Sequence, residues 1–346
     1  MHRTILGGIL VLAALACRQN SPRPPDDLTI SRLDTIVPAG NTLLGRPTEV
    51  TVDEHGLVFV NDPGFNAIQV LDSSGVRLRQ IGRAGAGPGE LMAPRAVIVA
   101  HDTLRVLDAA NTRIAIFLTS GTPIRTMTAP PSARGGPLTF NESGAFIVGR
   151  EGRDSVLALR FSPTGAAGSQ FGRLVVAAPS FWSFPAIKQQ IRDGNVPVEL
   201  RNHALPVLAS DGTAWLLLAA EGVIERYSPD DSLEWHLAFQ EPEFAGIRAA
   251  FFAQDQSDSS ASSFVSLDYF TTAHVVGPNL WVLVGPSPNS PTLLLVVGPD
   301  GGVMRRIRFP TAVGVRDFGL SPNRRLAYLV AYDDAVILRA HLPPGL

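Results

Sequence analysis

Residues 47–81 read PTEVTVDEHGLVFVNDPGFNAIQVLDSSGVRLRQI. This stretch contains four short apolar segments, which start at Pro47, Leu57, Ala67 and Val76. The segments alternate in polarity and are rich in β-branched residues, and turn-forming Gly, Asp, Ser and Pro residues lie between them. Such a pattern predicts four antiparallel strands joined by tight turns.

The same order of strands and turns recurs through the rest of the chain. The turn after the third strand marks each unit, at Leu71–Gly75, Phe117–Gly121, Phe161–Gly165, Tyr227–Asp231 and Val297–Gly301. Successive markers begin 46, 44, 66 and 70 residues apart, and a last unit covers Arg316–Leu342. Because a propeller blade has four strands and about 40–50 residues, the sequence predicts an all-β, six-bladed β-propeller of four-stranded antiparallel blades. We place this single domain at residues 28–346.

The connection between the first two units carries the most specific motif. It reads Gln80-Ile-Gly-Arg-Ala-Gly-Ala-Gly-Pro-Gly-Glu-Leu-Met-Ala-Pro94, and together with Val58–Asp62 and Val106–Ile114 it resembles the repeats of the NHL family. The motif match covers Leu44–Ile124, whereas the later units keep only the spacing. The resemblance implies a six-bladed propeller and little about chemistry, because this fold includes binding proteins, lactonases and lyases. No Lys-Ser/Thr follows the glycines, so we interpret the loop as an inter-blade turn rather than a phosphate site.

Closure of the ring requires a strand from another part of the chain. The last unit ends near Leu342 after three recognisable strands. Leu28–Ile36 is strand-like and precedes the first unit. We therefore predict that this segment forms the outer strand of the last blade, which removes the open edge of the ring.

The first 17 residues have the order of a secretory signal. His2 and Arg3 precede the apolar run Ile5–Ala16, which is too short to span a bilayer comfortably. The sequence Ala14-Leu-Ala-Cys17 resembles the lipobox of bacterial lipoproteins, which implies a signal peptide at residues 1–16 and lipidation of Cys17. The alternative is an ordinary signal peptide with an incidental cysteine. Residues 17–27 are polar and Pro-rich and are expected to form an extended tether.

This signal implies a lipid-anchored protein of the bacterial cell envelope. No Asp follows Cys17, which favours the outer membrane over retention in the inner membrane. Cys17 is the only cysteine, so the chain can form neither an intrachain disulfide nor a cysteine-based metal site. The formal net charge of -2 gives no electrostatic reason to expect nucleic acid binding. We expect a monomer whose N-terminal lipid makes the membrane contact.

Two inserts interrupt the repeat, at residues 179–205 and 242–270. Each contains a helix-like segment, Ala186–Arg192 in the first and Glu243–Phe252 in the second. Aromatic side chains in the inserts could anchor a partner, namely Phe181, Trp182, Phe184, Phe251 and Phe252. Both inserts follow the outer strand of a blade, so we expect them side by side on one face, where a protein, peptide or glycan partner binds. The alternative is that these aromatic residues pack the inserts onto the propeller.

Polar residues near the starts of the innermost strands are candidates for a site in the central channel. The acidic and imidazole candidates are Glu49, His203, His274 and Asp317, and the basic ones are Arg95 and Arg316. Gluconolactonase-like propellers hold a divalent cation on the channel axis with carboxylate and amide ligands, and two histidines with a carboxylate also suit zinc. The alternative is a solvated channel lined by ordinary polar groups. We predict no cofactor, and the alternative is a divalent cation held by these residues.

Two functional hypotheses follow from these features. The favoured one is a non-enzymatic binding or scaffold protein that recognises a partner on the insert-bearing face. The alternative is a metal-dependent hydrolase or lyase, similar to gluconolactonase, with its site in the channel. The sequence contains no Gly-x-Ser-x-Gly nucleophile motif. Asp62 and Asp108 recur at the end of the second strand, and we expect them to stabilise turns rather than to catalyse.

Overall fold

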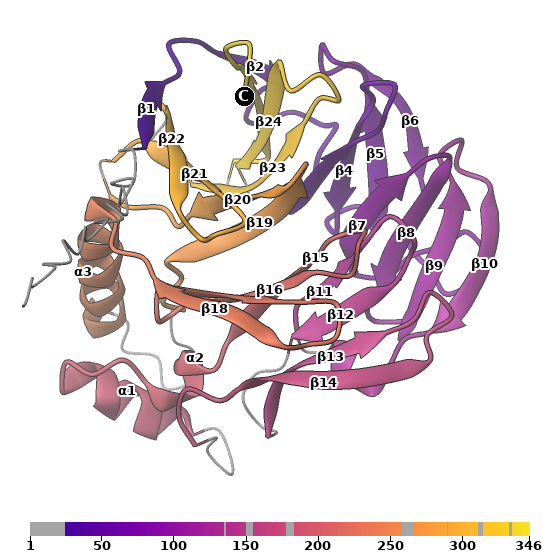
Figure 1. Cartoon of the computed structure of the whole chain (residues 1–346). Helices are drawn as coiled ribbons and strands as arrows, with labels where there is room; N and C mark the ends of the chain where they lie inside the picture. Colours follow the sequence, from indigo (N-terminus) through magenta and orange to yellow (C-terminus); the bar gives the residue numbers. More distant parts are fainter. Residues whose placement is uncertain are drawn as a thin grey trace, which may run out of the picture.

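The computed structural model describes residues 25–346 except residues 135, 150–154, 178–182, 258–265, 289, 311–313 and 332–333. Six sheets form a ring of blades, and each contains four antiparallel strands (Figure 1). The innermost strands contact one another in cyclic order, and the last of them contacts the first. The predicted six-bladed β-propeller is therefore confirmed.

The strands of blades 1–5 follow one another from the channel outward. Blade 1 comprises β3 (Glu49–Val52), β4 (Val58–Asp62), β5 (Ala67–Leu71) and β6 (Arg77–Ile81). Blade 2 comprises β7 (Pro94–Ala100), β8 (Thr103–Asp108), β9 (Arg113–Leu118) and β10 (Pro123–Thr128). The short 3-10 helix η1 (Pro131–Arg134) leads to blade 3, which comprises β11 (Leu138–Phe140), β12 (Phe146–Gly149), β13 (Val156–Phe161) and β14 (Ala167–Arg173). Blade 4 comprises β15 (Ala204–Leu208), β16 (Ala214–Leu218), β17 (Val223–Tyr227) and β18 (Leu233–Ala238). Blade 5 comprises β19 (Phe270–Val276), β20 (Asn279–Val284), β21 (Thr292–Val297) and β22 (Val303–Phe309).

Blade 6 combines the two ends of the domain. Its inner strands are β23 (Val315–Leu320), β24 (Leu326–Ala331) and β25 (Val336–His341), and β2 (Leu33–Val37) pairs antiparallel with β25 at the outer edge. The prediction that an N-terminal segment completes the last blade is confirmed. The predicted single strand Leu28–Ile36 is wrong in one respect, because β1 (Asp26–Thr29) is a separate strand that pairs in parallel with β22. β1 includes Asp26 and Asp27, the last two residues of the expected tether. Their carboxylates form ion pairs with Arg305 and Arg308 of β22.

The core explains why the second and third strands of the blades are mostly apolar. Six clusters of buried side chains lie at the six interfaces between neighbouring blades. In β4, Val58 and Val60 pack toward blade 6, whereas Phe59 packs toward blade 2. Successive side chains of a strand point to opposite faces, so a blade between two others needs apolar residues on both faces.

The Gly-rich connection between blades 1 and 2 is held by Arg113 of blade 2. The Arg113 guanidinium donates to the buried Asp108 carboxylate at 2.7 Å and to three carbonyl oxygens of the loop. The Glu90 carboxylate accepts a hydrogen bond from the Gly87 N–H at 2.7 Å. A β-carbon at Gly85, where φ is 152°, would collide with that carboxylate. The loop is therefore an inter-blade turn, as predicted.

Asp62 and Asp108 have equivalent structural roles in blades 1 and 2. Each accepts hydrogen bonds from backbone N–H groups of the segment that enters the innermost strand of its own blade: Gly45 and Arg46 for Asp62, and Met92 for Asp108. Asp62 also accepts from the Gly64 N–H of its own turn. These contacts confirm the predicted role in turns and add a second one within the blade.

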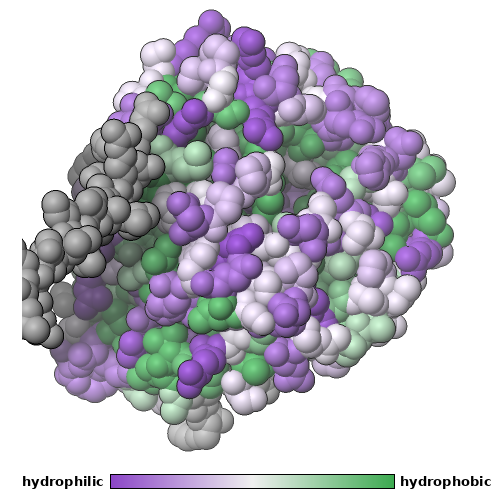
Figure 2. Space-filling view, viewed as in Figure 1, coloured by the Kyte–Doolittle hydropathy of each residue, from purple (hydrophilic) through white to green (hydrophobic). Residues whose placement is uncertain are grey.

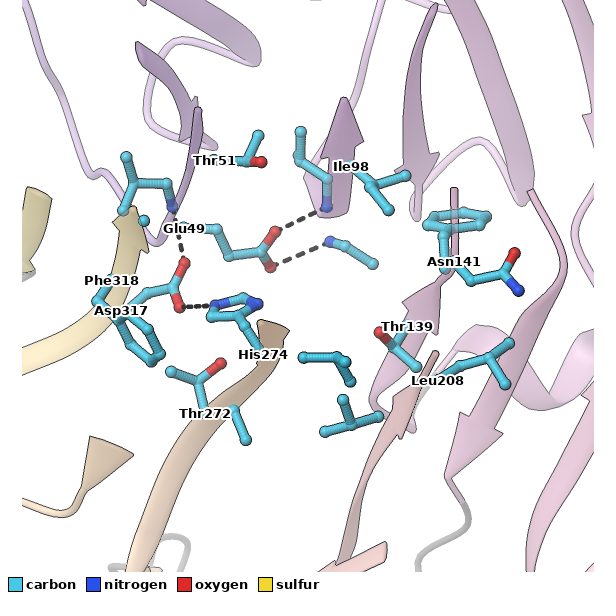
Figure 3. Close-up of a pocket in the computed structure, with 18 of the residues that line it drawn as sticks. Glu49, Thr51, Ile98, Thr139, Asn141, Leu208, Thr272, His274, Asp317 and Phe318 are labelled. Carbon is cyan, nitrogen blue, oxygen red and sulfur yellow. Dashed lines mark hydrogen bonds and ion pairs between the residues drawn. The ribbon is translucent and has the colours of Figure 1, made fainter. Parts of the chain in front are cut away.

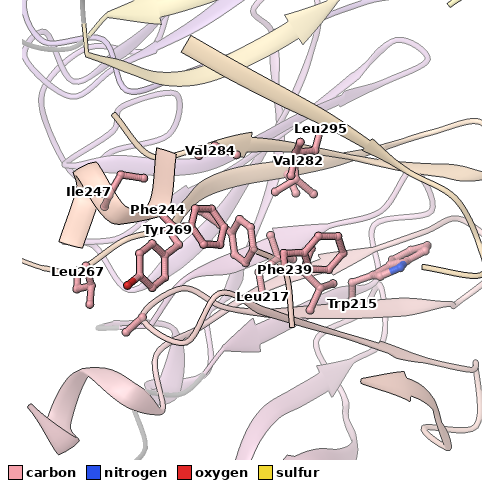
Figure 4. Close-up of a cluster of buried hydrophobic side chains, with 14 of the residues drawn as sticks. Trp215, Leu217, Phe239, Phe244, Ile247, Leu267, Tyr269, Val282, Val284 and Leu295 are labelled. Atoms are coloured by element: carbon pink, nitrogen blue, oxygen red, sulfur yellow. The ribbon is translucent and has the colours of Figure 1, made fainter. Parts of the chain in front are cut away.

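The two inserts are helical and form part of the hydrophobic core. They contain α1 (Phe184–Arg192), α2 (Val198–Arg201) and α3 (Pro242–Ser257), of which α1 and α3 contact each other at one edge of the ring (Figure 1). Figure 4 shows Phe244 and Ile247 of α3 in one cluster with Leu217 of blade 4 and Val282 of blade 5. The expected helices and their side-by-side arrangement are therefore present, and both helices extend beyond the predicted bounds.

The visible surface is mostly hydrophilic, with small separate hydrophobic areas (Figure 2). One of these areas lies at the lower left, where Figure 1 places α1, and α1 carries the exposed Phe184. Another lies at the right edge over β10, which carries the exposed Ile124. Among the described residues, no helix has both the length and the apolar composition needed to cross a membrane.

Candidate functional site

The central channel is a cavity of about 980 Å³. The six innermost strands, β3, β7, β11, β15, β19 and β23, form its wall. Figure 3 shows that threonine, aliphatic and amide side chains line much of it, including Thr51, Ile98, Thr139, Asn141, Leu208 and Thr272. One cluster of acidic and imidazole groups, Glu49, Asp317 and His274, lies where blades 5, 6 and 1 meet.

Glu49 and Asp317 bridge neighbouring blades in the same way. The Asp317 carboxylate on β23 accepts a hydrogen bond from the Val50 N–H of β3 at 2.7 Å. The Glu49 carboxylate on β3 accepts from the Ala96 and Val97 N–H groups of β7 at 3.0 and 2.9 Å. Those two N–H groups converge because β7 has a bulge at Ala96, where φ is 49°. Each carboxylate thus connects its own innermost strand to that of the next blade.

His274 extends this series of contacts to blade 5. Its Nε2 atom lies 2.9 Å from Oδ1 of Asp317, and its ring packs edge-on against Phe318 with the ring centroids 4.8 Å apart (Figure 3). The Asp317 side chain is 4% exposed, whereas 43% of the His274 side chain remains accessible. Asp317 therefore orients an imidazole that faces the channel.

The pKa values of Glu49 and His274 are both raised. Burial, reinforced by the nearby Asp317 charge, raises the pKa of the Glu49 carboxyl to about 7, although the two backbone N–H groups oppose this shift. Loss of hydration lowers the pKa of His274, but the charge and hydrogen bond of Asp317 and the charge of Glu49 outweigh that loss. The Glu49 carboxyl thus changes protonation near neutral pH, and His274 keeps its proton to a higher pH than a free imidazole does.

The described residues of the channel do not fit a divalent cation. Each carboxylate oxygen of Glu49 accepts a backbone hydrogen bond. Oδ2 of Asp317 accepts a hydrogen bond from the Val50 N–H, and Oδ1 lies within hydrogen-bond distance of His274. Across the described ranges, no three His, Cys, Asp or Glu side chains converge as metal ligands do. What the arrangement offers instead is an oriented histidine that can accept or donate a proton.

The remaining channel candidates lie apart from this cluster. Arg95 lines the channel and donates to the Ala133 carbonyl of η1 at 3.2 Å, which connects blade 2 to the approach of blade 3. Arg316 lines the channel as well. His203 does not line the channel, because it precedes β15 in the connection from α2. His203, a channel candidate from the sequence, therefore lies apart from Glu49, His274 and Asp317.

The predicted aromatic anchors have different positions. Phe181 and Trp182 lie outside the described residues. Phe184 is 39% exposed at the start of α1. Phe251 is 3% exposed and belongs to the core between blades 4 and 5, so its prediction as a surface anchor is wrong. Phe252 is half-buried beside it, with the Arg248 guanidinium carbon 5.0 Å from its ring centroid.

A second cavity, of about 510 Å³, lies between the two inserts and blade 4. We call it the insert pocket; its lining residues are Gln190, Asn195, Val196, Val198, Arg201, Ala220, Glu221, Arg248 and Tyr269. They come from α1, α2, the segment between them, the turn from β16 to β17, α3, and the residue before β19. No single insert forms this cavity.

Sequence reasoning missed the polar residues of the insert pocket. Arg201, Arg248 and Tyr269 carry no motif and are separated by 47 and 21 positions along the chain. The available signal was indirect, because all three lie within the two predicted inserts. Their convergence depends on the packing of α3 against α1, which local patterning does not report.

Comparison with known proteins supports the fold and not a family. No protein-family model matches the chain, and no curated protein sequence matches it. Among solved structures, the chain resembles an inactive virginiamycin B lyase from Staphylococcus aureus with quinupristin (TM-score 0.53, 12% identity, 90% of this chain and 99% of the lyase covered). It also resembles U3-55K, with a TM-score of 0.57 and 11% identity over 92% of this chain and 100% of U3-55K. The calcium-binding protein regucalcin from Agrobacterium tumefaciens matches with a TM-score of 0.52 and 8% identity over 92% of this chain and 95% of regucalcin. At such low identities the shared feature is the architecture, and the chain is a six-bladed β-propeller.

Proposed function

We propose that this protein is a lipid-anchored binding or scaffold propeller of the bacterial cell envelope, with a protein, peptide or glycan partner on its insert-bearing face. The observation that carries the proposal is the packing of the two inserts, which contact each other and enclose the insert pocket. In the described part of the chain, no other connection between blades contains an α-helix. Segments added to a repeat scaffold commonly provide its recognition surface.

The packing of the inserts into the core supports a binding role. Ile187 and Ile191 of α1 and Phe244 and Phe251 of α3 are buried in the core shared with blades 4 and 5. A preformed surface loses little conformational entropy when a partner binds. The proposed platform is thus a packed helical surface rather than a pair of loose loops.

The N-terminal sequence supports the location. Ala14–Cys17 resembles a lipobox, and β1, the first described strand, starts at Asp26. A tether of a few residues would therefore hold the propeller close to the membrane. The NHL-like connection at Gln80–Pro94 supports a relation to NHL propellers.

Site-specific photo-crosslinking tests the proposed face. Deletion of the inserts is unsuitable because it would remove core side chains of α1 and α3. A photoreactive residue replaces Ala186 of α1 or Ala249 of α3, both of which are exposed on the insert side. The matched control replaces the exposed Ser210, in the turn from β15 to β16 at the other end of blade 4.

We expect one envelope component to crosslink from both helix positions in intact cells and not from Ser210. Equal crosslinking from all three positions, or no crosslinked species from α1 and α3, would contradict the proposal. The two helix positions serve as internal replicates, because a partner on this face contacts both inserts.

A channel hydrolase or lyase is the second candidate. The observation in its favour is His274, which faces the channel and is oriented by Asp317. Elemental analysis of purified protein and of His274→Ala distinguishes the two ideas. We expect no stoichiometric divalent cation, whereas a bound cation that disappears in the variant would favour the enzyme.

A further inference from the structure

The insert pocket carries one positive charge in excess. Its charged lining residues are Arg201, Arg248 and Glu221. Arg201 forms a forked ion pair with Glu221, at 2.6 and 3.3 Å, so these two charges compensate each other. Within the described ranges, no acidic side chain pairs with Arg248, whose guanidinium lies over the Phe252 ring. A singly charged anion would therefore balance the pocket.

Neutral hydrogen-bond donors also face the pocket. Tyr269 is 9% exposed, and its ring stacks on Phe244 with the centroids 4.5 Å apart. Figure 4 shows its hydroxyl pointing away from this aromatic cluster. Among the described residues, neither that hydroxyl nor the side-chain amide of Asn195 has a hydrogen-bond partner. Solvent reaches both groups, so a ligand in the cavity would replace water as their hydrogen-bond partner.

The rest of the wall sets the shape of that ligand. Val196, Val198 and Ala220 form an apolar part of the lining. Arg201 uses two of its five N–H groups on Glu221, which leaves others for a second acceptor. A guanidinium group binds a planar carboxylate through two parallel hydrogen bonds.

We propose that the insert pocket binds one carboxylate group attached to a small apolar body. The charge of the lining matches a monoanion, the donors of Arg248, Tyr269 and Asn195 match its oxygens, and the valines match the body. The same chemistry is present at the C-terminal residue of a peptide and in a free N-acylated amino acid. This inference rests on the proposed function, because it names the group by which a partner would engage the insert-bearing face.

Calorimetric titration of the full-length protein tests the pocket. The probes are N-acetyl-leucine, its neutral C-terminal amide, and a pentapeptide ending in leucine in acid and amide forms. We expect both acids to bind and both amides to bind at least about tenfold more weakly, since a charge-assisted hydrogen bond is lost. Tighter binding of the pentapeptide acid than of N-acetyl-leucine would identify a peptide terminus as the source, and the reverse would identify a free acid.

Variants assign the effect to this pocket. Arg248→Gln is expected to weaken acid binding about tenfold or more, and Tyr269→Phe about threefold to tenfold. Arg192→Gln is the matched control, because Arg192 is exposed on α1 and does not line the pocket. Unchanged thermal unfolding would show that each variant is folded.

Two results would overturn the proposal: equal binding of acids and amides, or absence of acid binding by the wild-type protein. The crosslinking experiment separates this failure from failure of the proposed function. A partner that still crosslinks from Ala186 and Ala249 in Arg248→Gln would leave the face intact and exclude the carboxylate. Acid binding without any crosslinked partner would support the carboxylate site and contradict the proposed partner on this face.

Discussion

Single buried charges hold the connections of this propeller in place. Asp108 is fully buried and Arg113 is 17% exposed, so neither can replace its partner by water without cost. Arg113 also bonds to carbonyl oxygens of the Gly-rich connection, which has little regular structure of its own. One side chain thus couples the second and third strands of blade 2 to the entry of that blade.

We expect Arg113→Ala to lower the free energy of unfolding by about 3–5 kcal/mol, because it leaves a buried carboxylate without its cation. Urea denaturation followed by tryptophan fluorescence measures the change. Arg83→Ala is the matched control, since the Arg83 ion pair with Glu90 is largely exposed and should contribute less than about 1 kcal/mol. Equal losses in the two variants would contradict this interpretation.

The channel cluster predicts a pH dependence of stability. In the unfolded chain Glu49 loses its proton near pH 4.5, whereas the folded protein keeps it until about pH 7. The unfolded state therefore binds fewer protons in this window, and stability falls as the pH rises. His274 acts in the same direction, because its raised pKa supplies stability below pH 6.5 that is lost above the folded value.

The expected contribution of Glu49 is a loss of about 3 kcal/mol between pH 4.5 and 7. Denaturation curves of wild type and Glu49→Gln over this range measure it as a difference, which cancels the effect of other carboxylates. We expect the variant to lose stability less steeply than the wild type. Parallel pH profiles would show that the Glu49 carboxyl titrates normally.

At the level of elements, β2 closes the ring. It is the only described strand of blade 6 that comes from the N-terminal part of the chain, and it covers the outer edge of β25. Val37 is fully buried in the cluster between blades 6 and 1, while Thr35 of the same strand is exposed. The ladder with β25 is irregular between Thr35 and Val37, and the strand is buried most deeply at its Val37 end.

We expect Val37→Asp to prevent cooperative folding or to lower the free energy of unfolding by more than about 4 kcal/mol, because it places a charge in an apolar core. Thr35→Asp is the matched control and should cost less than about 1 kcal/mol. Thermal unfolding followed by circular dichroism compares them. A mild effect of Val37→Asp would mean that blade 6 is stable without its N-terminal strand.

At the level of the whole molecule, the proposed attachment to the membrane depends on Cys17. Cys17→Ser is expected to release the protein from membranes, because the propeller then lacks its proposed lipid, and stable anchoring needs more than one acyl chain. Fractionation of cells that express either form measures this. Arg18→Asp is a second variant that should move the lipidated protein from the outer to the inner membrane. Normal fractionation of Cys17→Ser would exclude the lipid anchor.

Local sequence patterns were enough to predict the strand order, the number of blades, the structural role of Asp62 and Asp108, and the origin of the closing strand. These features depend on neighbours along the chain, because alternating polarity and turn residues act over a few positions. The folded chain was needed to show that Glu49, His274 and Asp317 meet while His203 does not, that Phe251 is buried, and that Arg201, Arg248 and Tyr269 share a pocket. Residues far apart in sequence meet only after the ring closes and the inserts pack, and that packing sums many weak contacts that no local pattern encodes.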